Sequence, residues 1–233
     1  MKKVLIGTLY SGEGDFDRCC QSVKDQDYPS KHFVISDQAE VDAHMQLYKR
    51  FKDSNYDFLI KLDADMVFIN DDAVSRMVKL GMKGYDKVSF QVQDFFTNSR
   101  FFGVHLFSKH VKWKWTKFVS KNIKPDRLDN AKKKISVKEA LVYHCYYPNI
   151  RQSFHYGFHR IHKGQNTLCK DVLSHFEDNP DDSNLRAACL GMYAAIDSQF
   201  TKSNDYNSEF DDAFSRYSAK ELPNLVGRLR KML

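Results

Sequence analysis

No stretch of this 233-residue sequence approaches the roughly 18 consecutive apolar residues that would predict a membrane-spanning helix. The first residues also lack the pattern of a signal peptide, because the short apolar run after Lys2 and Lys3 soon gives way to glycine and polar residues. That run predicts a first strand instead. We therefore expect a cytoplasmic protein, with at most a peripheral contact at a membrane surface.

Cysteine is scarce and irregularly spaced. The five residues are Cys19, Cys20, Cys145, Cys169 and Cys189, an odd number that includes no C-x-x-C spacing. This pattern favours reduced thiols in the core over a disulfide framework or a zinc site.

A strong excess of one charge is also missing. With 36 basic and 30 acidic residues, the net charge is +6, which suits an anionic ligand but falls well short of a nucleic-acid-binding surface. The sequence has no internal repeat, low-complexity tract or Gly/Ser linker. We expect no nucleic-acid partner, and the oligomeric state stays open.

The glycine-rich segment at residues 7–14 lacks the residues of a phosphate-binding loop. Glu13 stands where a P-loop needs lysine, and Asp17 occupies the third glycine position of a dinucleotide fingerprint. These departures speak against a kinase, a GTPase or a dehydrogenase.

Strand and helix patterns alternate through the first hundred residues. Strands are predicted at 3–9, 33–36, 58–65, 88–92 and 104–107, and helices at 15–24, 41–51 and 71–80, the last capped by Asn70. Strands separated by helices predict an α/β fold, with a Rossmann-like mixed, mainly parallel sheet and helices on both faces. From about residue 165 the pattern becomes helical, which predicts a helical C-terminal tail.

Two carboxylates interrupt the apolar pattern of the third predicted strand, at Asp63 and Asp65. An unpaired charge is costly to bury, so these side chains need a partner. Because alternate residues of a strand share a face, we expect both to point the same way, with Lys61 beside them. Such a pair can seat a hard divalent cation. Asp37 and Asp94 also follow predicted strands, and ligands of α/β sheets bind beyond the carboxyl ends of the strands.

These residues together resemble the GT-A fold glycosyltransferases. The resemblance covers about residues 3–163, through a first strand ending in Gly7-Thr8-Leu9-Tyr10, the Asp63-Ala64-Asp65 motif, and a downstream segment at 143–160 that looks like the matching element of bacterial and viral members. It implies a metal-dependent transfer of a sugar from a nucleoside-diphosphate sugar to a glycan, glycolipid or glycoprotein acceptor. It also implies a catalytic domain at 1–164, with a nucleotide-sugar half at about 1–70 and an acceptor half at about 71–164, followed by a helical extension at 165–233.

The resemblance further implies a role for each matching residue. Thr8 and Tyr10 would contact the nucleotide base, and Asp37 would contact the base or the ribose. Lys61 and Asp63 would line the donor site around the ribose and the metal's waters, and His159 or Arg160 would contact the diphosphate. Asp65 and His144 would ligate the metal, and Asp94 would be the general base of an inverting enzyme. Gln93 replaces the acid that usually precedes that base. Imidazole suits softer ions, so His144 favours Mn²⁺ over Mg²⁺.

Other interpretations remain open. Asp37 and Asp94 could simply begin turns, as aspartate often does. Residues 109–121 mix lysines with aromatics, which predicts an amphipathic helix docked on the sheet. A non-enzymatic nucleic-acid-binding or membrane-binding module would instead use that segment. A sugar-phosphate nucleotidyltransferase is the main enzymatic alternative, although residues 7–14 contain no lysine or arginine to hold a triphosphate.

Overall fold

The computed structural model describes residues 1–113, 129–198 and 206–233, and these divide into two compact units. The first is an α/β unit of residues 1–93 and 100–146, and the second is a helical unit of residues 94–99 and 147–233. The sequence pattern instead predicted a boundary after residue 164. The helix that follows residue 149 therefore belongs with the helical unit and not with the sheet.

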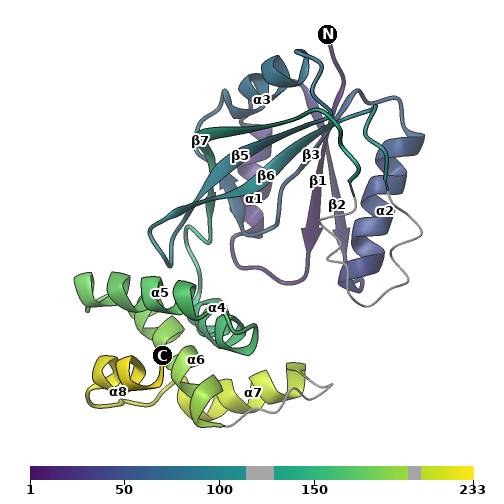
Figure 1. The fold of residues 1–233 in the computed structure, drawn as a ribbon. Helices are drawn as coiled ribbons and strands as arrows, with labels where there is room; N and C mark the ends of the chain where they lie inside the picture. The colour runs from purple at the N-terminus through teal and green to yellow at the C-terminus, as the bar shows by residue number, and fades with distance from the viewer. Residues whose placement is uncertain (114–128, 199–205) are drawn as a thin grey trace. The chain divides into compact units, whose positions relative to one another are not determined.

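Three parallel strands begin the α/β unit: β1 (Val4–Tyr10), β2 (Ser30–Ser36) and β3 (Phe58–Lys61) (Figure 1). β1 pairs with β2 on one side and with β3 on the other. Helix α1 (Phe16–Lys24) connects β1 to β2, and helix α2 (Glu40–Asp53) connects β2 to β3. These crossovers bring the carboxyl ends of the three strands to one edge of the sheet, where ligands of such folds bind.

The alternation of side chains along β1 separates two apolar layers. Val4 and Ile6 pack in a cluster with residues of α1 and of α3 (Ala73–Gly81). Leu5, between them, packs on the opposite face with residues of α2. Helices therefore cover both faces of the sheet, as the sequence predicted.

The remaining strands extend the sheet, which has the order β2-β1-β3-β6-β5-β7-β4 in the described residues. They are β4 (Met66–Phe68), β5 (Lys87–Asp94), β6 (Arg100–Ser108) and β7 (Lys134–His144). β6 is antiparallel to β3 and β5, and β4 is antiparallel to β7. The predicted mixed α/β fold is thus confirmed, with its parallel pairing in the first three strands.

Other predicted boundaries were also wrong, among them the start of α3 and the end of the third strand. Asp72, not Asn70, occupies the N-cap position of α3, and its side chain caps no backbone N–H. The third strand ends at Lys61 and does not continue to residue 65. Leu62 and Ala64 are fully buried although neither lies in a strand, so their apolar character extended the predicted strand too far.

The helical unit contains α4 (Ile150–His162), α5 (Asn166–Asp178), α6 (Ser183–Asp197), α7 (Tyr206–Tyr217) and α8 (Leu225–Met232) (Figure 1). α4 and α6 pack closely because glycines face the partner backbone. A Cβ at Gly157 would lie 1.9 Å from the carbonyl oxygen of Ala188, and one at Gly191 would lie 2.0 Å from that of Phe154. Glycine at both positions allows the two backbones to approach this closely, and both helices belong to the helical unit.

The predicted amphipathic helix at 109–121 falls largely outside the described residues. At its beginning, the ammonium group of Lys109 donates hydrogen bonds to the carbonyl oxygens of Phe51 and Lys52 at the end of α2, at 3.0 and 2.8 Å. Trp113 stacks on Tyr48 with ring centroids 4.1 Å apart and forms a bridge with Asp129, so the described start of this segment is not helical.

None of the five cysteines forms a disulfide, and four of them are buried. Among the described residues, no helix is both long and apolar enough to span a membrane.

Candidate metal centre at the end of the third strand

The chain makes a tight turn between β3 and β4, and this turn carries both predicted aspartates. Leu62 donates its backbone N–H to the carbonyl oxygen of Gly7 at 3.1 Å, which continues the pairing with β1 for one residue. Met66 then donates its N–H to the carbonyl oxygen of Asp63 at 2.9 Å, which closes the turn. Asp63 and Asp65 therefore lie in a turn and not on one face of a strand.

Asp65 meets His144, the residue predicted to share a metal with it. The Nε2 atom of His144 lies 3.2 Å from Oδ2 of Asp65, and the two side chains are only 12% and 21% exposed. The antiparallel pairing of β4 with β7 explains this contact, because Met66 is paired with His144. The structure thus brings together two residues that are far apart in the sequence.

Cys145 completes the cluster, although it was not among the predicted site residues. Its Sγ atom lies 3.6 Å from Oδ2 of Asp65 and 3.7 Å from Nε2 of His144. Its backbone N–H donates to the carbonyl oxygen of Asp65 at 2.8 Å, and its φ of 54° is in the left-handed region that non-glycine residues seldom adopt. The available signal was its position directly after His144, but the cysteine count had suggested only core thiols.

The environment keeps Asp65 ionised. Burial alone would raise its pKa, but the charge of His144 and hydrogen bonds from His144 and Cys145 outweigh burial, so the pKa of Asp65 is lowered. A carboxylate held in its charged form beside an imidazole is suited to bind a divalent cation.

Asp63 has a different partner. Its carboxylate forms an ion pair with Lys61, whose side chain is only 10% exposed, whereas that of Asp63 is 38% exposed. Asp63 and Asp65 therefore have different partners, and because β3 ends at Lys61, the expectation that they share a face of one strand was wrong. Lys61 is beside Asp63, as expected.

The residues predicted to hold the nucleoside differ in exposure. Thr8 is fully buried, and its hydroxyl lies 3.0 Å from Nε2 of His32, which does not favour a direct contact with a base. Tyr10 is partly exposed and stacks on Phe16 at 4.0 Å between ring centroids. Asp37 is exposed directly after β2, with a left-handed φ of 56°.

Asp94 is the last residue of β5 and groups with the helical unit. Its Oδ2 atom accepts hydrogen bonds from the backbone N–H and the hydroxyl of Thr97 at 2.9 and 2.7 Å and from the hydroxyl of Tyr156 at 3.2 Å. Asp94 is 2% exposed. With three donors on one oxygen, this carboxylate has the geometry of a structural cap, which was the simpler of its two interpretations.

His159 and Arg160 make their described contacts inside the helical unit. His159 stacks on His155 at 5.4 Å between ring centroids. The guanidinium of Arg160 lies 4.4 Å from the ring centre of Tyr156 and donates to the side-chain oxygen of Gln165 at 2.9 Å.

Of the groups predicted to hold a metal, Asp65 and His144 fit that role by geometry. Their ligand atoms and the thiol of Cys145 all lie within 4.8 Å of one another, and no other such cluster occurs in the described residues. The donor set is one carboxylate oxygen, one imidazole nitrogen and one sulfur, a combination typical of borderline divalent ions.

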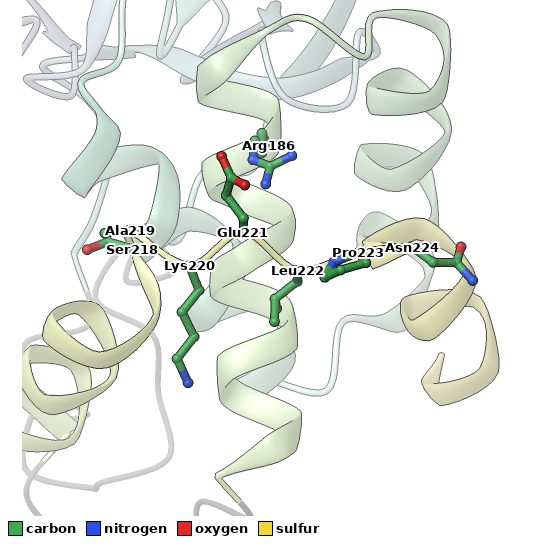
Figure 2. A pocket seen from close by; sticks show the side chains of 8 residues that line it. All are labelled: Arg186, Ser218, Ala219, Lys220, Glu221, Leu222, Pro223 and Asn224. Atoms are coloured by element: carbon green, nitrogen blue, oxygen red, sulfur yellow. The ribbon is translucent and has the colours of Figure 1, made fainter.

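Two hollows lie outside this cluster. One, of about 390 Å³, is lined by residues of β5, β6 and β7 that include Gln93, Arg100 and Tyr143. The other, of about 570 Å³, lies in the helical unit between Arg186 and residues 218–224, as Figure 2 shows. None of the predicted site residues lines the larger hollow. In the smaller hollow, the guanidinium of Arg100 donates a hydrogen bond of 3.1 Å to the side-chain oxygen of Gln93.

No protein-family model and no curated protein sequence matches this chain. Solved structures with partial similarity include A197 from STIV, with 13% identity, a TM-score of 0.41, and coverage of 62% of this chain and 85% of that chain. They also include S. aureus TarS in complex with UDP-GlcNAc, with 12% identity, a TM-score of 0.41, and coverage of 98% and 84%. A mannosyltransferase from Pyrobaculum calidifontis in complex with GDP-Man and Mn²⁺ has 10% identity, a TM-score of 0.42, and coverage of 98% and 78%. These similarities are too weak to assign a family, a substrate or a metal to this chain.

Proposed function

We propose that this protein is a metal-dependent glycosyltransferase that moves a sugar from a nucleoside-diphosphate sugar to a glycan, glycolipid or glycoprotein acceptor. One observation carries the proposal: the carboxylate of Asp65 and the imidazole of His144 meet at 3.2 Å beside the carboxyl end of β3. That is the edge at which an α/β sheet of this kind binds nucleotides.

The cation, Mn²⁺ or Mg²⁺, would supply charge stabilisation for the diphosphate as the bond to the sugar breaks. Asp65 provides an ionised oxygen for it, and His144 provides a nitrogen that favours Mn²⁺. The turn from Leu62 to Met66 fixes Asp65, since both ends of the turn are tied by backbone hydrogen bonds. The antiparallel pairing of β4 with β7 fixes His144 opposite it.

Four further residues are candidates for contact with the donor. Asp63 is the more exposed of the two acids, and its ion pair with Lys61 holds it at the rim of the site, where a ribose hydroxyl could exchange with the ammonium group. Tyr10 ends β1, and Asp37 directly follows the neighbouring strand β2, so these two residues are the candidates for contact with the nucleoside.

Glu13 speaks against a sugar-phosphate nucleotidyltransferase, which would bind a triphosphate with the loop after β1. Its carboxylate accepts hydrogen bonds from the backbone N–H and the hydroxyl of Ser11, at 2.7 and 2.6 Å. A loop that binds a triphosphate needs these donors for phosphate oxygens, and a carboxylate there repels them.

A thermal-shift screen of nucleotide sugars, with and without Mn²⁺, tests the proposal. UDP-GlcNAc and GDP-mannose are the first compounds to include, together with the free nucleoside diphosphates and triphosphates. A donor that binds only the folded protein raises its melting temperature, and we expect that rise to require Mn²⁺. Release of a nucleoside diphosphate on addition of acceptor sugars would then establish transfer, whereas pyrophosphate release from a triphosphate would establish the nucleotidyltransferase.

A further inference from the structure

We infer that the thiol of Cys145 is a third protein ligand of the metal, and that it makes the centre select a thiophilic ion such as Zn²⁺ or Co²⁺ over Mg²⁺. The inference rests on the proposed metal site and argues against Mg²⁺ as the ion that this site takes. It starts from the triangle formed by Sγ of Cys145, Oδ2 of Asp65 and Nε2 of His144.

The sides of this triangle match one face of a tetrahedron. Zinc ligands at their usual bond lengths are separated by about 3.3 Å between nitrogen and oxygen and by about 3.6 Å between sulfur and either of them. The observed separations are 3.2 Å between His144 and Asp65, and 3.6 and 3.7 Å from the sulfur to the oxygen and to the nitrogen.

An octahedral Mg²⁺ suits this donor set less well, because the ion prefers oxygen throughout. Sulfur is a poor ligand for Mg²⁺, whereas thiolate, imidazole and carboxylate together suit Zn²⁺ and Co²⁺. Three protein ligands also leave the fourth tetrahedral position open, as in catalytic zinc sites, and a phosphate oxygen of the donor would occupy it.

The backbone holds the sulfur in this position. Cys145 directly follows β7 in a left-handed conformation, and its N–H is bonded to the carbonyl oxygen of Asp65 at 2.8 Å. The same residue is therefore tied to Asp65 through both its backbone and its side chain. On binding, the thiol releases its proton to solvent and the thiolate forms the bond to the metal.

Cobalt spectroscopy tests this ligand directly. Co²⁺ added to the wild-type protein, kept reduced with a phosphine, should give the near-ultraviolet sulfur-to-cobalt charge-transfer band together with the strong visible bands of a tetrahedral ion. Cys145→Ser should abolish the charge-transfer band and weaken Zn²⁺ binding at least about tenfold, the scale of losing even an outer partner of a metal ligand. Cys20→Ser, which changes a half-buried thiol of α1, is the matched control and should keep both.

The outcomes separate this inference from the proposed function. If Co²⁺ binds and Asp65→Asn weakens it, but the charge-transfer band is missing or survives in Cys145→Ser, the thiol is not a ligand and the inference is wrong while the metal site stands. If no divalent ion binds, or if binding is the same in Asp65→Asn, both the inference and the proposed function fail. Equal affinity for Mg²⁺ and Zn²⁺ in the wild type would also overturn the inference.

Discussion

The backbone N–H of Cys145 is bonded to the carbonyl oxygen of Asp65, and this one bond joins the turn after β3 to the end of β7. It places the carboxylate of Asp65 beside the imidazole of His144 at an edge of the sheet. The candidate centre is therefore built from two segments that become neighbours only when β4 pairs with β7.

Replacing Asp65 should impair metal-dependent activity without unfolding the protein. We expect Asp65→Asn to lower sugar transfer and Mn²⁺-dependent nucleotide binding by about a hundredfold or more, because the amide loses the charge that holds the cation. EDTA should have the same effect on the wild type, and added Mn²⁺ should reverse it. Asp53→Asn, at an exposed position of α2, is the control and should leave both unchanged. Turnover that is equal in Asp65→Asn and in the control would remove the metal role.

Asp94 could be either a general base in catalysis or a structural cap of a turn, and two variants distinguish these roles. If its three hydrogen bonds make it a turn cap, then Asp94→Asn and Thr97→Val should both lower the free energy of unfolding, by about 1–3 kcal/mol each. Chemical denaturation and steady-state rates of the two variants would be compared. A hundredfold or larger loss of rate in Asp94→Asn with unchanged stability, and no loss in Thr97→Val, would instead identify Asp94 as the general base.

The contact between α4 and α6 should tolerate no side chain. Gly157→Ala and Gly191→Ala would each place a methyl group about 2 Å from a carbonyl oxygen of the other helix, and we expect each to cost about 1–3 kcal/mol or more. Gly164→Ala serves as the comparison, since it has φ of +65° but no atom within 4 Å of a new Cβ. Its cost should stay at about 1 kcal/mol, from backbone conformation alone. Equal losses in all three variants, measured by urea denaturation, would show that the close helix contact is unimportant.

Lowering the pH should destabilise the fold at pH values above those at which its carboxylates titrate. Burial, reinforced by nearby cations, lowers the pKa of His105 and of His159 to about 3 and that of His155 to about 4. The unfolded chain, with histidine pKa values of about 6.5, then binds more protons than the native state below that pH, so stability is lost as the pH falls. Each histidine contributes a slope of up to about 1.4 kcal/mol per pH unit.

Urea denaturation between pH 6.5 and 5 would measure this slope. His105→Leu should make the dependence shallower by about the contribution of one histidine, because the variant has nothing to protonate at that position. A wild-type stability that stays constant or rises as the pH falls over this range would contradict the buried, neutral state of the three side chains.

Local patterns predicted the three helices and five of the strands of the α/β unit, but not β7 and not β4 as a separate strand. The alternation in Val4, Leu5 and Ile6 and the helical spacing in α2 follow directly from which face each residue buries, and the structure contains both elements. The pairing of Asp65 with His144 was also anticipated, although through a family resemblance and not through periodicity. Nothing local to residue 65 indicates which distant segment it meets.

The missed features depend on contacts between segments. The end of β3 at Lys61 was hidden because Leu62 and Ala64 are buried by the turn and so look like strand residues. The assignment of α4 to the helical unit depends on Gly157 meeting α6, and a missing side chain gives little signal in one sequence. Cys145 was overlooked for a similar reason, since its thiol becomes a candidate ligand only beside Asp65 and His144.

The position of the bound ion is the most direct test of the central claim. An anomalous difference map from crystals grown with Mn²⁺ and a nucleoside diphosphate should show a peak about 2.0–2.3 Å from the Asp65 carboxylate and from Nε2 of His144, with the phosphates beside it. A nucleotide bound elsewhere, or a peak that touches neither Asp65 nor His144, would contradict the account.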